Sequence, residues 1–397
     1  MSAAPIGGPY LTKTSVIAAA LVAIMGTIVV IRLFTGLGEV TNLNNGFAWG
    51  LWIAYDVVAG TALACGGYAV ALVVYVLNRG RYHPLVRPAL LASMFGYGLG
   101  GLSVLLDIGR WWNFWHILWP SYFNPNSVML EVALCIACYT MVLFLEFAPA
   151  ITEWLVAVTR ARGGLTFLVS KTLHRILNRV VFVFIALGML LPTMHQSSLG
   201  TMLVPFGNYV HPLWQTPILP ALYIVSAIGL GYAVVMFEAT LVTTRYRLPT
   251  EARILAFMVK YMLCANSLYL VLRLGNLAFD GKLGLVFTSG GLSVAFLAEI
   301  FLFALPVVLM LPRANRIVPR LQFISALSMM VGAVMYRIDG YLVAYHHAGW
   351  HYFPSVPEIL LSGGMIAAEV LGYALLIKLL PVLHLPAGRA AAAPIHQ

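Results

Sequence analysis

Residues 190–200, LLPTMHQSSLG, place polar groups where the neighbouring sequence is apolar enough to lie in lipid. Thr193, His195, Gln196 and Ser197 follow directly on the run RVVFVFIALGM. Polar side chains at membrane depth are costly unless they face a bundle interior or a ligand. A histidine, an amide and hydroxyls can exchange a proton or orient a polar ring. We therefore expect this end of the span to face a shared site.

A second polar group opens the segment NNGFAWGLWIAYD. Asn45, Trp49, Trp52 and Asp56 are four, three and four residues apart, so the spacing predicts one helical face. Indole rings together with amide and carboxyl groups can hold a flat ligand and supply it with protons. The adjacent Gly46 lies at the start of the same expected helix.

A third polar group lies in the segment NPNSVMLEV, which also contains Asn126. Asn124, Ser127, Glu131 and Cys135 again recur at helical spacing, with Glu131 about one turn inside the expected span. A carboxyl that faces a bundle interior is a candidate for proton exchange. We expect Glu131 to face the interior in this way.

Other charged residues have readings that the sequence leaves open. Asp107 and Arg110 are three apart and can form a structural ion pair. The tryptophans of the segment that follows them are typical of an interfacial aromatic belt. In the second half, charged residues inside expected spans could form a proton path or ion pairs that hold a bundle: Glu238, Arg273, Glu299, Arg337, Asp339 and Glu369.

Composition identifies the class of protein that positions these residues. Of the 397 residues, 61% are hydrophobic and 9% are charged, whereas soluble domains carry about 25% charged residues. The chain is therefore an integral membrane protein, and the fold class is all-α. The net charge of +10 resides in short loops between apolar runs, which favours a membrane topology signal over binding to nucleic acid.

A membrane span needs about 20 apolar residues, and the sequence predicts ten spans. These are 14–36, 46–77, 86–109, 126–157, 177–203, 217–243, 254–279, 284–311, 319–345 and 357–383. Arginine and lysine concentrate in the connections after the even-numbered spans. The positive-inside rule then predicts that both termini lie in the cytoplasm and that the odd-numbered connections lie outside. The three polar groups described above would all lie at the external end.

Spans four and eight resemble each other, as do spans five and nine, which suggests an internal repeat. We therefore expect two four-helix bundles, spans two to five and spans six to nine, with flanking first and last spans. The predicted domains are 1–45 (first span and external loop), 46–205 (first bundle with the ligand site), 206–350 (second bundle) and 351–397 (last span and disordered tail).

The residue types argue against bound metal or haem. Most of the ten histidines lie in or beside loops, and no pair is placed for a transmembrane di-haem centre. The four cysteines are dispersed among apolar segments, so neither an iron–sulfur cluster nor another metal site is expected. A site with indole faces, a carboxyl, a histidine and amide donors suits a quinone, whose reduction requires two protons. Electrons would have to come from a partner outside the membrane.

Several segments together resemble the polysulfide reductase/NrfD family, and within it the membrane subunits that serve hydrogenase-2 type NiFe-hydrogenases. They are NGFAWGLWIAYD, NRGRYHPLVRPALLASMFGYGLGGLSVLLDIGR, FNPNSVMLE, LEFAPA, LLPTMHQSSLG and HPLWQ, and the similarity runs from about residue 30 to about residue 385. The resemblance implies a haem-free, quinone-reactive anchor for menaquinone or ubiquinone. It also implies a ferredoxin-like iron–sulfur subunit and the small and large hydrogenase subunits as partners on the periplasmic face.

The family motifs imply roles for individual residues. Glu131 matches a carboxyl implicated in proton transfer, and His195 joins it as a catalytic candidate. Asn45 and Gly46 open the quinone-facing helix, and Trp49 takes a ring-contacting place that is histidine in some members. The full set of predicted quinone-binding residues is Asn45, Gly46, Trp49, Trp52, Asp56, Arg110, Asn126 and Ser197. The predicted proton-path residues are Asp56, Glu131, Glu238 and Glu299.

Two other functions remain as alternatives. The same kind of anchor could serve another periplasmic oxidoreductase, such as a molybdenum enzyme or a multihaem reductase; a copurified partner would separate the two. An ion-coupled transporter would use the in-span charges as an ion route, and would show solute flux without any redox partner. The absence of paired Gly/Pro-broken helices argues against the transporter.

Overall fold

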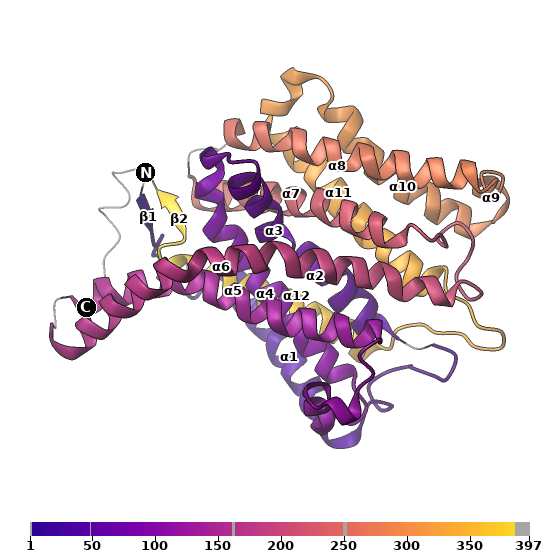
Figure 1. Cartoon of the computed structure of the whole chain (residues 1–397), viewed down its shortest axis with the longest axis horizontal. Coiled ribbons are helices and arrows are strands. Elements are labelled where there is room, and N and C mark those ends of the chain that lie inside the picture. Colours follow the sequence, from indigo (N-terminus) through magenta and orange to yellow (C-terminus); the bar gives the residue numbers. More distant parts are fainter. Residues whose placement is uncertain (1, 48, 161–162, 249–251, 386–397) are drawn as a thin grey trace.

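The computed structural model describes residues 2–47, 49–160, 163–248 and 252–385. In this part of the chain, ten helical segments are long and apolar enough to cross a membrane, which confirms the expected all-α membrane fold. A short antiparallel pair, β1 (Ser2–Ala4) with β2 (Leu383–Leu385), brings the two described chain ends together (Figure 1). We call this the β end of the molecule and the opposite one the far end. The predicted disordered tail, AGRAAAAPIHQ at 387–397, lies outside the described residues.

The first group of four spans packs around the second span. That span is a succession of short helices: η1 (Trp52–Ala59), α2 (Gly60–Leu63), α3 (Gly66–Ala71) and η2 (Leu72–Val76). The others are α4 (Val86–Asp107), α5 (Val128–Thr159) and α6 (Gly164–Leu203). Contacts join α4 to the second span, α5 to α4, and α6 to α5 along their length. The connections contain η3 (Gly80–Leu85), η4 (Trp111–Leu118) and η5 (Pro120–Tyr122).

The second group consists of α7 (Leu219–Tyr246), α8 (Ala252–Phe279), α10 (Gly291–Met310) and α11 (Pro319–Ile338), which continues as η8 (Asp339–Val343). Each of these helices contacts two or more of the others. Helix α7 also packs on α3 and α6, so it joins the two groups. Short helices η6 (Val204–Phe206), α9 (Leu285–Thr288) and η7 (Arg313–Ile317) complete the connections.

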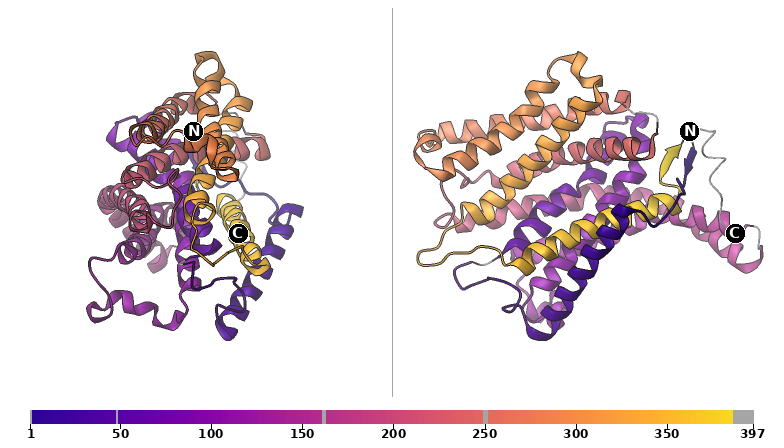
Figure 2. Two further views of the ribbon diagram at one scale, coloured as in Figure 1. Left: turned by 90° about the vertical axis from the view of Figure 1, so that its right-hand side faces the viewer. Right: turned by 180° about the vertical axis from the view of Figure 1, so that it is seen from behind.

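The first and last spans form a separate pair against the first group. Helix α1 (Lys13–Thr35) lies beside α12 (Val356–Leu379), and α12 also contacts α4 and η1 (Figure 2). Both helices begin with a capping box, in which Thr12 and Ser15, or Ser355 and Glu358, satisfy each other's backbone donors. Such caps fix a helix start in sequence.

Three predicted span starts were wrong by more than five residues, among them that of the eighth span, which begins at Gly291 rather than at 284. The second span begins near Trp52 rather than at 46, because residues 46, 47, 49 and 50 are not helical. Gly46 and Gly50 pack against the connection that precedes α12. A Cβ on Gly46 would lie 2.2 Å from the ring of Trp350, so the close approach itself requires glycine. The fifth span begins at Gly164 rather than at 177, and most of the added length lies outside the bundle.

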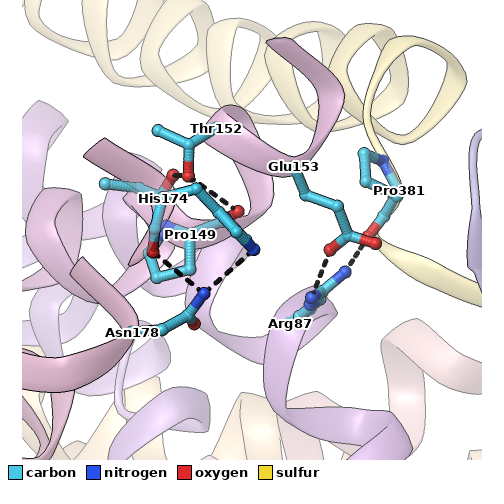
Figure 3. A network of polar contacts seen from close by, with 8 residues as sticks. Arg87, Pro149, Thr152, Glu153, His174, Asn178 and Pro381 are labelled. Carbon is cyan, nitrogen blue, oxygen red and sulfur yellow. Dashed lines mark hydrogen bonds and ion pairs between the residues drawn. The ribbon is translucent and has the colours of Figure 1, made fainter. Parts of the chain in front are cut away.

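At the β end, α4, α5, α6 and the chain after α12 are tied by side chains (Figure 3). Arg87 forms an ion pair with Glu153 at 2.7 Å and donates to the Pro381 carbonyl. The Thr152 hydroxyl lies 2.9 Å from His174 Nδ1, and Asn178 Nδ2 lies 2.9 Å from His174 Nε2. These contacts fix where α5 and α6 leave the bundle.

Candidate functional site

Trp49 lies at the far end, at the junction between the two groups of spans. Its indole nitrogen donates to the Tyr341 carbonyl at 2.8 Å, and its ring packs on Phe206, Tyr341 and Tyr345. The indole is almost fully buried. Because Trp49 precedes η1, it does not share a helical face with the residues that follow.

Trp52 and Asp56 lie on the opposite side, toward α12. Trp52 packs with Leu106 and Met365, and its indole nitrogen donates to the Glu358 carbonyl at 3.3 Å. Asp56 accepts a hydrogen bond from the Ser362 hydroxyl at 2.8 Å. The predicted single face for Asn45, Trp49, Trp52 and Asp56 is therefore wrong. The π-helical winding of η1 is a feature that recurs at functional sites.

Asn45 and Gly46 lie in the irregular segment before η1, where Asn45 is exposed and Gly46 is buried. Nearby, Tyr352 bridges this segment to α12: its hydroxyl accepts from the Leu51 amide and donates to Glu358. Burial, and then the hydrogen bond to Glu358, raise the pKa of Tyr352. The phenol therefore stays protonated and keeps its donor role at neutral pH.

His195 is fully buried and contacts the second span. Its Nε2 lies 2.9 Å from the Thr61 hydroxyl, and its ring packs edge-on against Tyr97. The neighbouring Gln196 donates weakly to Thr61 and accepts from Arg337 of α11 at 3.1 Å. The polar end of the fifth span thus lies inside the protein, and it bonds to both groups of spans. Ser197 is half-buried one residue further on.

Glu131 does not face the bundle interior, contrary to the expectation. It lies in the first turn of α5 with an exposed side chain, next to exposed Asn126. The adjacent Val132, on another side of α5, is already buried in the core, whereas on the side of Glu131 burial begins one turn deeper, at Cys135. A carboxyl in the first helical turn is favoured by the helix dipole.

Asp107 and Arg110 do not form the expected ion pair among the described residues. Arg110 is exposed, whereas Asp107 Oδ1 is buried without a hydrogen-bond partner. The guanidinium that reaches this turn is Arg32 of α1, which donates to the carbonyls of Leu106 and Ile108. The positive charge near Asp107 therefore comes from Arg32 of the first span, and not from Arg110 as the sequence spacing predicted.

A cavity of about 820 Å³ lies between α1, α12, α7 and the second span. Its walls are largely apolar, but three carboxyl groups line it: Asp56, Glu238 and Glu369. Arg245 and Lys378 line it near the β end. A second cavity of about 480 Å³, at the β end, shares Glu238 and Tyr373 with it. The structure thus brings Asp56 and Glu238 together and adds Glu369.

Glu299 belongs to a different environment inside the second group. It is fully buried, 3.7 Å from Arg273, and accepts hydrogen bonds from Trp214 Nε1 and the Tyr269 hydroxyl. Two nitrogens of Arg273 lack hydrogen-bond partners. Glu131 and Glu299 lie in the two spans, four and eight, that resemble each other in sequence, yet Glu299 is buried and paired while Glu131 is exposed.

Several of these residues carry little or no signal in the sequence. Thr61, Ser362 and Tyr97 look like ordinary residues of apolar helices, and no spacing distinguishes them. Arg337 and Glu369 stand out as charges inside spans. Gln196, which binds Arg337, and the carboxyls that share a cavity with Glu369 lie on helices distant in sequence. For Arg337 and Glu369, the charge inside a span is the signal that the sequence offers. Thr61, Ser362 and Tyr97 offer no such signal.

Comparison with known proteins points to one family. The family model described as polysulphide reductase, NrfD matches residues 39–345. A protein of Escherichia coli named probable Ni/Fe-hydrogenase 2 b-type cytochrome subunit is 43% identical over 96% of this chain and 94% of its own. The menaquinone reductase integral membrane subunit of Nitratidesulfovibrio vulgaris is 33% identical over 52% of this chain and 48% of its own. A selenate reductase subunit of Mesobacillus selenatarsenatis is 30% identical over 38% of this chain and 35% of its own.

The name of the first relative includes a b-type cytochrome, a protein that holds haem. A b-type haem held by two histidines needs a facing pair. Among the described histidines only His195 is fully buried, and its ring meets Thr61 and Tyr97 rather than another histidine. The described residues likewise contain no group of three or more metal-ligating side chains. These residues do not fit a bis-histidine haem.

The match covers most of the chain and extends over both groups of spans. This multi-pass membrane protein belongs to the polysulphide reductase NrfD family, whose relatives include membrane subunits of hydrogenase and reductase complexes.

Proposed function

We propose that the chain is the membrane anchor and quinone-reactive subunit of a NiFe-hydrogenase. It would take electrons from a ferredoxin-like iron–sulfur subunit and pass them, with two protons, to menaquinone or ubiquinone. The observation that carries the proposal is the 43% identity to a hydrogenase 2 subunit along nearly the whole chain. The relative named menaquinone reductase supports the quinone as electron acceptor.

The proposed quinone site lies at the far end, around the start of the second span. Glu131 and His195 would exchange protons, and Asn45, Gly46, Trp49, Trp52, Asp56, Arg110, Asn126 and Ser197 would contact or orient the ring. Asp56 supports this placement because it lines a largely apolar cavity that could receive an amphiphile. Exposed Glu131 and Asn126 would then face the partner subunits or the quinone that enters beside them.

Two proton routes are consistent with this site. Glu131 is open to the far end, whereas Asp56 shares its cavity with Glu238 and Glu369, toward the β end. We propose that the cavity carboxyls carry protons to Asp56. Glu299, which is paired with Arg273 and does not line the cavity, would serve a separate path or stabilise the second group.

We also propose the sidedness predicted by the basic loops. The β end would face the cytoplasm of a bacterial cell, and the far end would carry the partner subunits on the periplasmic side. The relative from a selenate reductase favours a second candidate: an anchor for another oxidoreductase. Copurification with the chain would show which catalytic subunits accompany it.

The proposal is tested by hydrogen-dependent reduction of a quinone analogue and of a dye, in membranes with and without this chain. Quinone reduction should require the chain, and dye reduction should not, since the dye takes electrons upstream. In the assembled complex, Glu131→Gln should abolish quinone reduction and spare dye reduction. Glu39→Gln, an exposed carboxyl before the second span, is the matched control. If neither activity depends on the chain, the hydrogenase assignment is wrong.

A further inference from the structure

Helices α5 and α6 form a hairpin longer than a bilayer requires. The 40 residues of α6 span about 60 Å at about 1.5 Å per residue, whereas the hydrocarbon layer is about 30 Å thick. Figure 1 shows the end of the hairpin leaving the bundle and projecting past β1 and β2. We call this end, residues 153–160 and 163–179, the basic arm.

An apolar stripe runs along the free side of the arm. Leu165, Leu168, Val169, Leu173 and Ile176 recur at helical spacing, and all five are exposed. The same stripe continues into the span through exposed Val183, Leu187 and Leu190. From the first to the last of these residues the stripe is about 38 Å long. The stripe is therefore longer than the hydrocarbon layer is thick. All of its side chains can contact lipid only if the arm leans into the interfacial layer.

A basic stripe flanks the apolar one. Lys171, Arg175 and Arg179 are spaced four residues apart and exposed, and none of them forms an ion pair among the described residues. The described acidic residue of the arm is Glu153, which is already paired with Arg87. The free side of the arm thus combines unneutralised positive charge with apolar side chains.

The base of the arm is held at a fixed place on the bundle (Figure 3). Glu153 is tied through Arg87 to the chain after α12, and the Thr152–His174–Asn178 contacts join α5 to α6. The arm is therefore attached beside the β-end rim of the spans, where lipid headgroups would lie.

We propose that the basic arm lies in the headgroup layer and binds anionic phospholipid. Its apolar stripe enters the acyl boundary, and Lys171, Arg175 and Arg179 contact the phosphates. A helix with these two faces is typical of interfacial binding, and basic residues beside a span attract anionic lipid. Continuity with the lipid-facing stripe of the same helix favours lipid over a protein partner. This inference does not depend on the proposed quinone chemistry.

The test uses the full chain reconstituted in phosphatidylcholine vesicles containing phosphatidylglycerol. Cys138 and Cys264, the exposed cysteines, are changed to Ser, and Leu168→Cys carries a fluorophore. Quenching is compared between brominated phosphatidylglycerol and brominated phosphatidylcholine at equal mole fraction. We expect the anionic lipid to quench about fivefold more strongly at low salt, and less at high salt.

The triple change Lys171→Gln, Arg175→Gln and Arg179→Gln should bring that ratio close to one. A matched triple, Arg253→Gln, Arg313→Gln and Arg320→Gln, alters three exposed arginines in or beside other connections and should leave the ratio unchanged. If neither lipid quenches the label, the arm is not in the membrane and the proposal fails. Disulfide cross-links between two Leu168→Cys chains would then show that a second copy of the chain covers the free side of the arm. A ratio that the basic-stripe change does not alter also overturns the proposal.

Discussion

At the residue scale, two arginines inside the spans have polar partners on other helices. Arg337 of α11 donates to Gln196 of α6, and Arg273 of α8 lies beside Glu299 of α10. Aromatic rings cover both guanidiniums: Tyr223 for Arg337, and Phe296 and Tyr336 for Arg273. The first contact joins the two groups of spans, and the second holds the second group together. The contacts of Arg337 and Arg273 thus form only when these helices lie side by side.

Removing one member of the Arg273–Glu299 pair should be strongly destabilising. Arg273→Met leaves the Glu299 carboxyl buried without its cation, which typically costs about 3–5 kcal/mol of unfolding free energy. Thermal or denaturant unfolding of the detergent-solubilised chain measures the loss. Adding Glu299→Leu to Arg273→Met should recover much of it, because no unpaired charge remains. If the double variant is as unstable as the single one, packing rather than charge explains the effect.

The cavity carboxyls make a separate residue-level prediction, which rests on the proposed function. Asp56→Asn keeps the bond from Ser362 but cannot release a proton, so hydrogen-to-quinone turnover should fall at least about tenfold while dye reduction persists. Glu299→Gln lies outside the cavity and tests whether the second group takes part. Full turnover in Asp56→Asn would remove the cavity from the proton route.

At the scale of elements, close helix contacts set the relation between the two groups of spans. A Cβ on Gly231 of α7 would lie 2.5 Å from the Cys65 carbonyl oxygen and 2.7 Å from the Ala69 Cβ. Backbone cannot yield as a long side chain can, so α7 would have to move away from α3. Small residues at such contacts allow membrane helices to approach closely.

Gly231→Ala should therefore destabilise the protein by about 1–3 kcal/mol, the usual cost of overpacking. Gly98→Ala in α4 is the matched control, since nothing lies within 4 Å of the added Cβ. There the better helix propensity of alanine should add roughly 0.5–1 kcal/mol. The difference in unfolding midpoint between the two variants is the measurement. Equal effects would contradict the close α3–α7 contact.

At the scale of the whole molecule, much of the fold could be predicted from the sequence, and less of the site. Span number and approximate position follow from hydropathy, because each span needs about 20 apolar residues of its own and a backbone hydrogen-bonded within the same helix. The hydrogen bonds of Thr61 and Gln196 and the cavity beside Glu369 could not be predicted, since they depend on which helices lie side by side. Glu131 shows the same limit: a helical stripe gives a face, but not the depth at which neighbours begin to cover it.

The junction of the two chain ends also makes stability depend on pH. His384 lies in β2, and burial, followed by the nearby positive charge of Arg87, lowers its pKa below the usual value of 6.5. In the unfolded chain the imidazole takes up a proton near pH 6.5, before the folded chain does. The unfolded state then binds more protons, so this contribution to stability is complete above pH 6.5 and is lost as the pH falls below it.

Unfolding midpoints measured between pH 7.5 and pH 5.5 should therefore decline less in His384→Asn than in the unmodified chain. His211, at the far end, has its pKa lowered by burial and by His346, so it adds a decline of the same sign that persists in the variant. Because His384 lies in the strand that pairs with Ser2–Ala4, the change in pH dependence shows whether β1 and β2 are still paired when the protein unfolds. A His384→Asn chain with an unchanged pH dependence would mean that the β1–β2 junction has already opened before the spans unfold.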